Sequence, residues 1–189
     1  MIILASGSPR RRELLGRITR DFEVVVSDVS EEVDSTDPDE VVRELASRKA
    51  AAVSRSCPER VVIGCDTIVW CQGEILGKPR DLADAARMMR LLAGRDHLVY
   101  TGVALMRSGR TLVRRDRTQV FFTPISEPEL QRYLAAGDVL DKAGGYAIQG
   151  AASKFISRVD GSCSGVMGLP VEMTYHMLLD FGALDDADR

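Results

Sequence analysis

Apolar residues along the chain fall into short β-branched runs and into stretches with helical spacing. The runs predict strands at residues 2–5, 22–27, 60–71, 97–107, 111–123 and 154–159. The helical spacing predicts helices at residues 8–18, 37–54, 81–93 and 126–137, and after residue 170. Because strands and helices mix along the chain and neighbouring strands read as antiparallel, the pattern predicts an α/β fold with a mixed sheet.

Capping and turn residues mark several of the predicted boundaries. Ser8 and Asp37 each precede a proline, which is the arrangement of an N-cap followed by the first helical residue. The dipeptide Ser108-Gly109 lies between the strands predicted at residues 97–107 and 111–123 and is typical of a tight hairpin. These residues predict where elements start without reference to the rest of the chain.

Composition narrows the class of protein. At 189 residues the chain fits one domain, predicted to span residues 1–189, that buries roughly 70% of its unfolded surface. Acidic and basic residues are interspersed and the net charge is −3, so we expect no nucleic-acid partner. No apolar run is long enough for a membrane span, so we expect no membrane association. The four cysteines lack paired spacing, which predicts reduced thiols and a cytoplasmic location.

The stretch "ASGSPRRRELL" at residues 5–15 carries positive charge into the start of a helix. A helix N-terminus presents unpaired N–H groups to an anion, and the first-turn residues Arg10 and Arg11 add donors suited to phosphate. The pattern therefore indicates a phosphate site. The alternative is that Ser8 only caps the helix and the arginines are solvated surface.

Two charged residues lie in apolar surroundings. Asp66 interrupts the run "VVIGCDTIVW", where a carboxylate needs a metal, a cation or hydrogen bonds; alternatively it ends the strand and caps a turn with Thr67. Lys49 shares the apolar stripe of its helix, so its ammonium points inward. Taken alone, it is more simply explained by a side chain that extends along the surface to water.

Further polar residues lie in loops. Lys78 stands between a glycine and a proline in "GKPRD", while Lys142 and Gln149 flank "AGGYAI", whose glycines allow close approach to a flat ligand. With carboxylates at Glu31 and Asp66, the set matches the needs of a nucleoside triphosphate and a divalent metal.

Other familiar arrangements find little support. No P-loop, zinc-protease or dinucleotide-binding motif occurs, and the two histidines are isolated and better explained as structural. "GSCSG" places Cys163 where a nucleophile would stand, but it follows an Asp-Gly turn and lacks an evident acidic partner for a downstream histidine. A cysteine hydrolase is therefore a minor alternative.

Four blocks of sequence resemble the Maf family of nucleoside triphosphate pyrophosphatases, in the same order: "LASGSPRRRELL", "VIGCDTIVWCQGEILGKPRD", "DKAGGYAIQG" and "VMGLPVEMT". The resemblance implies two lobes around a central cleft, similar to the inosine triphosphatase group. It also implies hydrolysis between the α- and β-phosphates with a divalent cation such as Mg or Mn, and it allows for a homodimer.

The resemblance also implies roles for individual residues. Asp66 matches the proton acceptor. The positions that bind phosphate or metal in the family match Ser8, Arg11, Glu31, Lys49 and Lys78. Of these, Glu31 would hold the metal together with Asp66, with Glu32 as the neighbouring alternative. Base choice falls to Arg10, Thr67 and Gln149, which match the branch acting on dTTP and UTP, whereas the branch preferring 7-methyl-GTP differs at all three.

A rival hypothesis is a non-catalytic nucleotide-binding regulator of cell division, because the same cations would serve binding alone. Asp66 favours the enzyme over the regulator, since a protein that only binds a polyanion gains nothing from a buried carboxylate unless a metal bridges the two.

Overall fold

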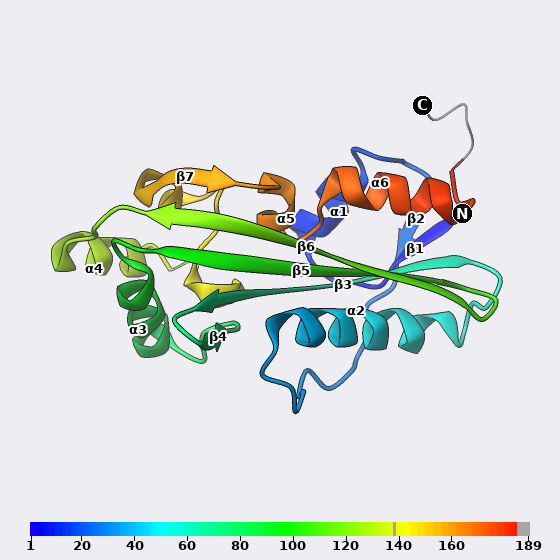
Figure 1. Ribbon diagram of the computed structural model, residues 1–189, viewed down its shortest axis with the longest axis horizontal. Helices are drawn as coiled ribbons and strands as arrows, with labels where there is room; N and C mark the ends of the chain where they lie inside the picture. Colours follow the sequence, from blue (N-terminus) through cyan, green and yellow to red (C-terminus); the bar gives the residue numbers. More distant parts are fainter. Residues whose placement is uncertain (138, 185–189) are drawn as a thin grey trace. The chain divides into compact units, whose positions relative to one another are not determined.

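The structure, a computed structural model, describes residues 1–137 and 139–184. Its seven strands within these residues form a mixed sheet of order β2-β1-β3-β5-β6-β7, with β4 paired to β3 (Figure 1). β1 runs parallel to β2 and β3, whereas β4 is antiparallel to β3 and β7 to β6. The predicted mixed α/β class is confirmed.

The strands are β1 (Ile2–Leu4), β2 (Phe22–Val24), β3 (Val61–Cys71), β4 (Glu74–Leu76), β5 (Asp96–Arg107), β6 (Arg110–Phe122) and β7 (Ile156–Asp160). The α-helices are α1 (Pro9–Leu15), α2 (Pro38–Ser54), α3 (Leu82–Leu92), α4 (Glu127–Ala135), α5 (Cys163–Met167) and α6 (Val171–Asp180). Two 3₁₀ helices, η1 (Ala143–Gly145) and η2 (Ala151–Phe155), complete the list.

The chain divides into two compact units. The first unit contains Met1–Asp66, Thr101–Asp116 and Gly168–Arg189, and the second contains Thr67–Tyr100 and Arg117–Met167. The prediction of one catalytic domain over residues 1–189 stays a prediction, and so does the central cleft.

In the first unit, α2 packs closely on β3. Figure 1 shows α2 on one face of the strands, with α1 and α6 on the other. Ala46 and Ala50 of α2 belong to one buried cluster with Val62 of β3. A Cβ added to Gly64 would lie 2.1 Å from the carbonyl oxygen of Ala46, so only glycine allows this separation of helix and strand. The contact brings the middle of α2 beside the middle of β3.

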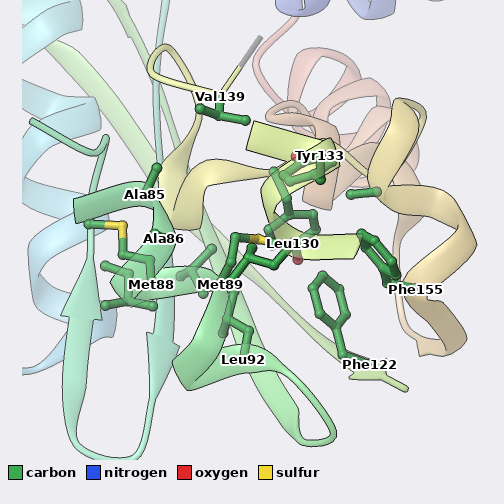
Figure 2. Close-up of a cluster of buried hydrophobic side chains, with 14 of the residues drawn as sticks. Ala85, Ala86, Met88, Met89, Leu92, Phe122, Leu130, Tyr133, Val139 and Phe155 are labelled. Atoms are coloured by element: carbon green, nitrogen blue, oxygen red, sulfur yellow. The ribbon is translucent and has the colours of Figure 1, made fainter. Parts of the chain in front are cut away.

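The second unit has its own apolar core, shown in Figure 2. Met89 and Leu92 of α3 pack there with Leu130 and Tyr133 of α4, and Phe122 of β6 belongs to the same cluster. The amphipathic spacing that predicted α3 and α4 therefore places their apolar faces against each other.

Several boundaries differ from the predictions. The strand expected at residues 22–27 ends at Val24, and Val24, Val25 and Val26 are 40%, 40% and 67% exposed. β2 is an edge strand, where one neighbour supplies few ladder bonds, so β-branched residues alone do not extend it. α1 ends at Leu15 instead of residue 18, and the chain continues in tighter turns, with Arg17 N–H bonded to the Leu14 carbonyl and Ile18 N–H to the Leu15 carbonyl. The helix α5 was not predicted.

The four cysteines are free thiols, as predicted. Among the described helices, none combines the length and the apolar character that a bilayer crossing requires.

Candidate active site

Ser8 and Arg11 are held in place at the loop that follows β1. The Ser8 hydroxyl accepts a hydrogen bond from the Arg11 backbone N–H at 3.4 Å and caps α1. The Arg11 guanidinium donates from Nε to the Gly168 carbonyl at 2.9 Å and from Nη1 to the Ser6 hydroxyl at 3.3 Å. Arg11 is thus anchored within the first unit. The alternative that it is a solvated surface arginine is wrong. Arg10, its neighbour, is half-buried.

Ser6 is a site candidate that sequence reasoning missed. It is 7% exposed, and its hydroxyl accepts from the Ser8 backbone N–H and from Arg11. The only local signal was a hydroxyl residue directly after a buried strand, which many loops share. A cavity of 560 Å³ opens beside this loop, lined by Ser6, Gly7, Ser8, Pro9, Arg12, Glu13, Gly16, Arg17, Phe22 and Val24.

Lys49 joins two carboxylates from different segments. Its Nζ lies 2.6 Å from Oδ1 of Asp66 on β3 and 2.7 Å from Oε1 of Glu31 in the loop before α2. The Lys49 and Asp66 side chains are 11% and 9% exposed, whereas Glu31 is 54% exposed. The ammonium therefore points into the body of the unit, and it does not extend along the surface to water.

Asp66 lies in the middle of β3, five residues after its first residue, and so does not end the strand. The alternative of a turn-capping aspartate is wrong, because the strand continues to Cys71. A buried carboxylate on a central strand needs a cationic partner, and Lys49 supplies it.

Glu31 is distinguished from its neighbour by these contacts. Glu32 is exposed, and its backbone carbonyl accepts from Arg48 at 2.6 Å. Glu31 is the member of the acidic pair that contacts Lys49. The structure therefore places Glu31, Lys49 and Asp66 together, as expected if these charged residues form one site.

Cys65, next to Asp66, is not a reactive thiol. Burial raises the pKa of Cys65 to about 11, although the nearby cations Arg11 and Lys49 lower it. A thiol with this pKa stays protonated near neutral pH, so it is a poor nucleophile.

The remaining predicted residues belong to the second unit. Thr67 is half-buried on β3, while Lys78 and Gln149 are exposed. The segments that carry Lys78 and Gln149 are joined by a hydrogen bond from Gly144 N–H to the Gly77 carbonyl at 3.0 Å. The structure thus links these two sequence-distant segments within one unit.

Asp66 and Glu31 are the two carboxylates that the sequence suggests as ligands of a metal ion. Within the described parts of the chain, no group of three histidine, cysteine, aspartate or glutamate side chains is arranged to hold an ion. Asp66 and Glu31 nevertheless direct an oxygen each toward one cation, the Lys49 ammonium. Hard carboxylate oxygens suit Mg²⁺ and Mn²⁺, which bind through one or two carboxylates when a substrate supplies phosphate oxygens.

The chain is similar to known proteins over most of its length. Residues 1–181 match the family model of the Maf-like protein. The dTTP/UTP pyrophosphatase of Symbiobacterium thermophilum is 47% identical over 182 residues, 96% of this chain and 94% of the relative. The proteins of the same name from Bacillus cytotoxicus and Pelotomaculum thermopropionicum are 46% and 45% identical, covering 95% and 96% of this chain and 94% and 96% of their own. Among solved structures, the Staphylococcus aureus Ham1 protein matches with a TM-score of 0.49 and 17% identity, over 64% of this chain and 71% of that one.

Proposed function

The chain belongs to the Maf-like protein family, and from this premise we propose that it is a nucleoside triphosphate pyrophosphatase that hydrolyses dTTP and UTP. Relatives 45–47% identical over nearly their whole length are dTTP/UTP pyrophosphatases. The observation that carries the proposal is the buried Asp66–Lys49 pair with Glu31 at its open side. It combines a base, a phosphate-binding cation and a second carboxylate.

In the proposed reaction, Asp66 takes a proton from a water molecule that attacks the α-phosphorus. The new bond joins the water oxygen to that phosphorus, the bond to the α–β bridging oxygen breaks, and pyrophosphate leaves. Lys49 holds the Asp66 carboxylate in place and, with Arg11 and Lys78, balances the charge on the phosphate oxygens. No covalent intermediate with the protein is required.

Asp66 and Glu31 would hold the divalent cation, which when bound supplies positive charge to the phosphate oxygens. Ser8 would contact the phosphates at the start of α1. Arg10, Thr67 and Gln149 would select the base, since the Gln149 amide can both donate to and accept from the edge of uracil or thymine. We expect the reaction to take place in the cytoplasm.

The test is hydrolysis of dTTP, UTP, CTP and 7-methyl-GTP by the purified protein with Mg²⁺ or Mn²⁺, in water labelled with ¹⁸O. We expect pyrophosphate as product, the label in the nucleoside monophosphate, and preference for dTTP and UTP. Asp66→Asn should lower kcat by about a hundredfold or more, the scale of a lost general base.

The two adjacent glutamates supply a matched control. Glu31→Gln should impair turnover and raise the metal concentration needed, whereas Glu32→Gln should behave as wild type. Release of orthophosphate, or label in pyrophosphate, would place the attack elsewhere. Tight nucleotide binding without turnover would favour the regulator of cell division.

A further inference from the structure

Residues 142–150, here named the glycine-rich segment, are held at three consecutive positions in the second unit. Gly144 N–H donates to the Gly77 carbonyl at 3.0 Å, and the Tyr133 hydroxyl donates to the Gly145 carbonyl at 2.9 Å. The Tyr146 hydroxyl lies 2.7 Å from Nε2 of His97. Each bond ties the segment to a different part of the unit.

The backbone of the segment has little freedom to take another path. Gly144 and Gly145 have φ angles of 68° and 73°, in the left-handed region that favours glycine. A Cβ on Gly144 would lie 3.1 Å from the Val69 side chain, and one on Gly145 would lie 3.5 Å from Pro79. The two glycines allow the chain to reach the core, where Tyr146 follows as the next residue.

His97 and Tyr146 form a buried polar pair. They are 2% and 5% exposed, and Phe122 packs edge-on against both rings with centroid distances of 5.0 Å. Phe122 and Tyr133 are seen in the surrounding core in Figure 2. Nδ1 of His97 is buried without a hydrogen-bond partner in the described structure, so the contact with Tyr146 is the bond that the ring makes.

A neutral imidazole suits this pair. Burial lowers the pKa of His97 to about 4, against a smaller opposing effect of Asp96. The ring is therefore uncharged near neutral pH, and separating it from Tyr146 would leave two buried polar groups unpaired. This requirement keeps Tyr146, and the segment around it, in one position.

We propose that His97 and Tyr146 are positioning residues for substrate binding. They hold the glycine-rich segment that carries Gln149 and, through the Gly144–Gly77 bond, the segment that carries Lys78. The pair then acts chiefly on affinity and base choice, through Gln149, and has a smaller effect on kcat through Lys78, because Asp66 and Lys49 belong to the other unit. The inference rests on the proposed function for the identity of the substrate.

The first test is Tyr146→Phe, which removes the hydroxyl and keeps the ring that packs on Phe122. We expect KM for UTP to rise about tenfold while kcat changes less than threefold, and the preference for UTP over CTP to fall by a similar factor. Hydrogen exchange should accelerate in residues 142–150 and 77–79 and stay unchanged in residues 61–66.

Variants of His97 distinguish the effect of its hydrogen bond to Tyr146 from the effect of its ring packing. The Gln side chain of His97→Gln can still meet the Tyr146 hydroxyl, so this variant should lie nearer wild type than His97→Leu. Tyr175→Phe and His176→Gln, on α6 of the first unit, are matched controls and should leave KM and base choice unchanged.

The inference would be overturned if Tyr146→Phe kept the wild-type KM for UTP, the wild-type preference for UTP over CTP and the wild-type rates of hydrogen exchange. A fall in kcat with KM unchanged would also overturn it. If His97→Leu does not fold, Tyr146→Phe still decides. Absence of pyrophosphatase activity in the wild type would refute the proposed function, while the exchange experiment would still test whether the pair holds the two segments.

Discussion

Replacing Lys49 by methionine removes the ammonium and keeps an unbranched side chain, which leaves the Asp66 carboxylate buried without its cation. At 2.6 Å and an effective dielectric constant of about 20, the attraction between the two charges is about 6 kcal/mol. Part of this offsets the cost of burying both groups. We therefore expect Lys49→Met to lower the free energy of unfolding by about 3–5 kcal/mol, the usual cost of breaking a buried ion pair from one side.

A double-mutant cycle measures how much of that cost belongs to the pair. Asp66→Asn and the double variant complete the cycle, with urea denaturation at pH 7.5 as the assay. The double variant should be more stable than the sum of the single effects by about 2–3 kcal/mol, because it no longer buries a lone charge. Glu31→Gln should cost less than about 1 kcal/mol, since that side chain is 54% exposed and well screened.

Additive single effects, with a coupling energy below about 0.5 kcal/mol, would refute the reasoning. They would mean that Lys49 and Asp66 do not depend on each other for their burial. A cost for Glu31→Gln as large as that for Lys49→Met would likewise contradict the assignment of the buried partner.

Three other predictions follow from individual residues. Gly64→Ala should destabilise the protein by about 3 kcal/mol or more, because the new Cβ would lie 2.1 Å from a backbone oxygen of α2. Gly77→Ala is the control, because nothing lies within 4 Å of its Cβ, and its free energy of unfolding in the same urea assay should differ from wild type by less than about 0.5 kcal/mol. The pKa of His97 is lowered to about 4, so the stability that the neutral ring contributes is present above pH 6.5 and is lost as pH falls from there toward 4. Between pH 7 and 5 the free energy of unfolding should fall by about 2 kcal/mol for this reason. A His97→Gln variant whose free energy of unfolding depends on pH in the same way would contradict this. Gln149→Glu should reduce kcat/KM for dTTP and UTP by about 10- to 100-fold in steady-state assays, and an unchanged value would remove Gln149 from base recognition.

Much of the secondary structure was predictable because its signals are local. Asp37 caps α2 by accepting from the Asp39 backbone N–H at 2.9 Å, and Pro38 occupies the first turn, as the sequence predicted. Ser108 and Gly109 have φ angles of 48° and 78° and connect β5 to β6, as their turn chemistry indicated. In such places neighbouring residues alone decide the conformation.

Boundaries that depend on sheet position were less predictable. Val25 and Val26 have strong β propensity, but β2 lies at the sheet edge and ends before them. Asp66 was compatible with a strand end or a strand interior, and the length of β3 settled the question. Pairing with neighbouring strands, which propensity does not describe, determines both outcomes.

The residue types of the candidate site could be selected from the sequence, but their partners could not. Lys49 taken alone was more simply explained by extension to water, but its actual partners lie 18 and 17 residues away along the chain at Glu31 and Asp66. The bond between His97 and Tyr146 spans 49 residues. Only tertiary packing decides such contacts, because the close approach of α2 to Gly64 brings Lys49 to Asp66, and two left-handed glycines bring Tyr146 into the core.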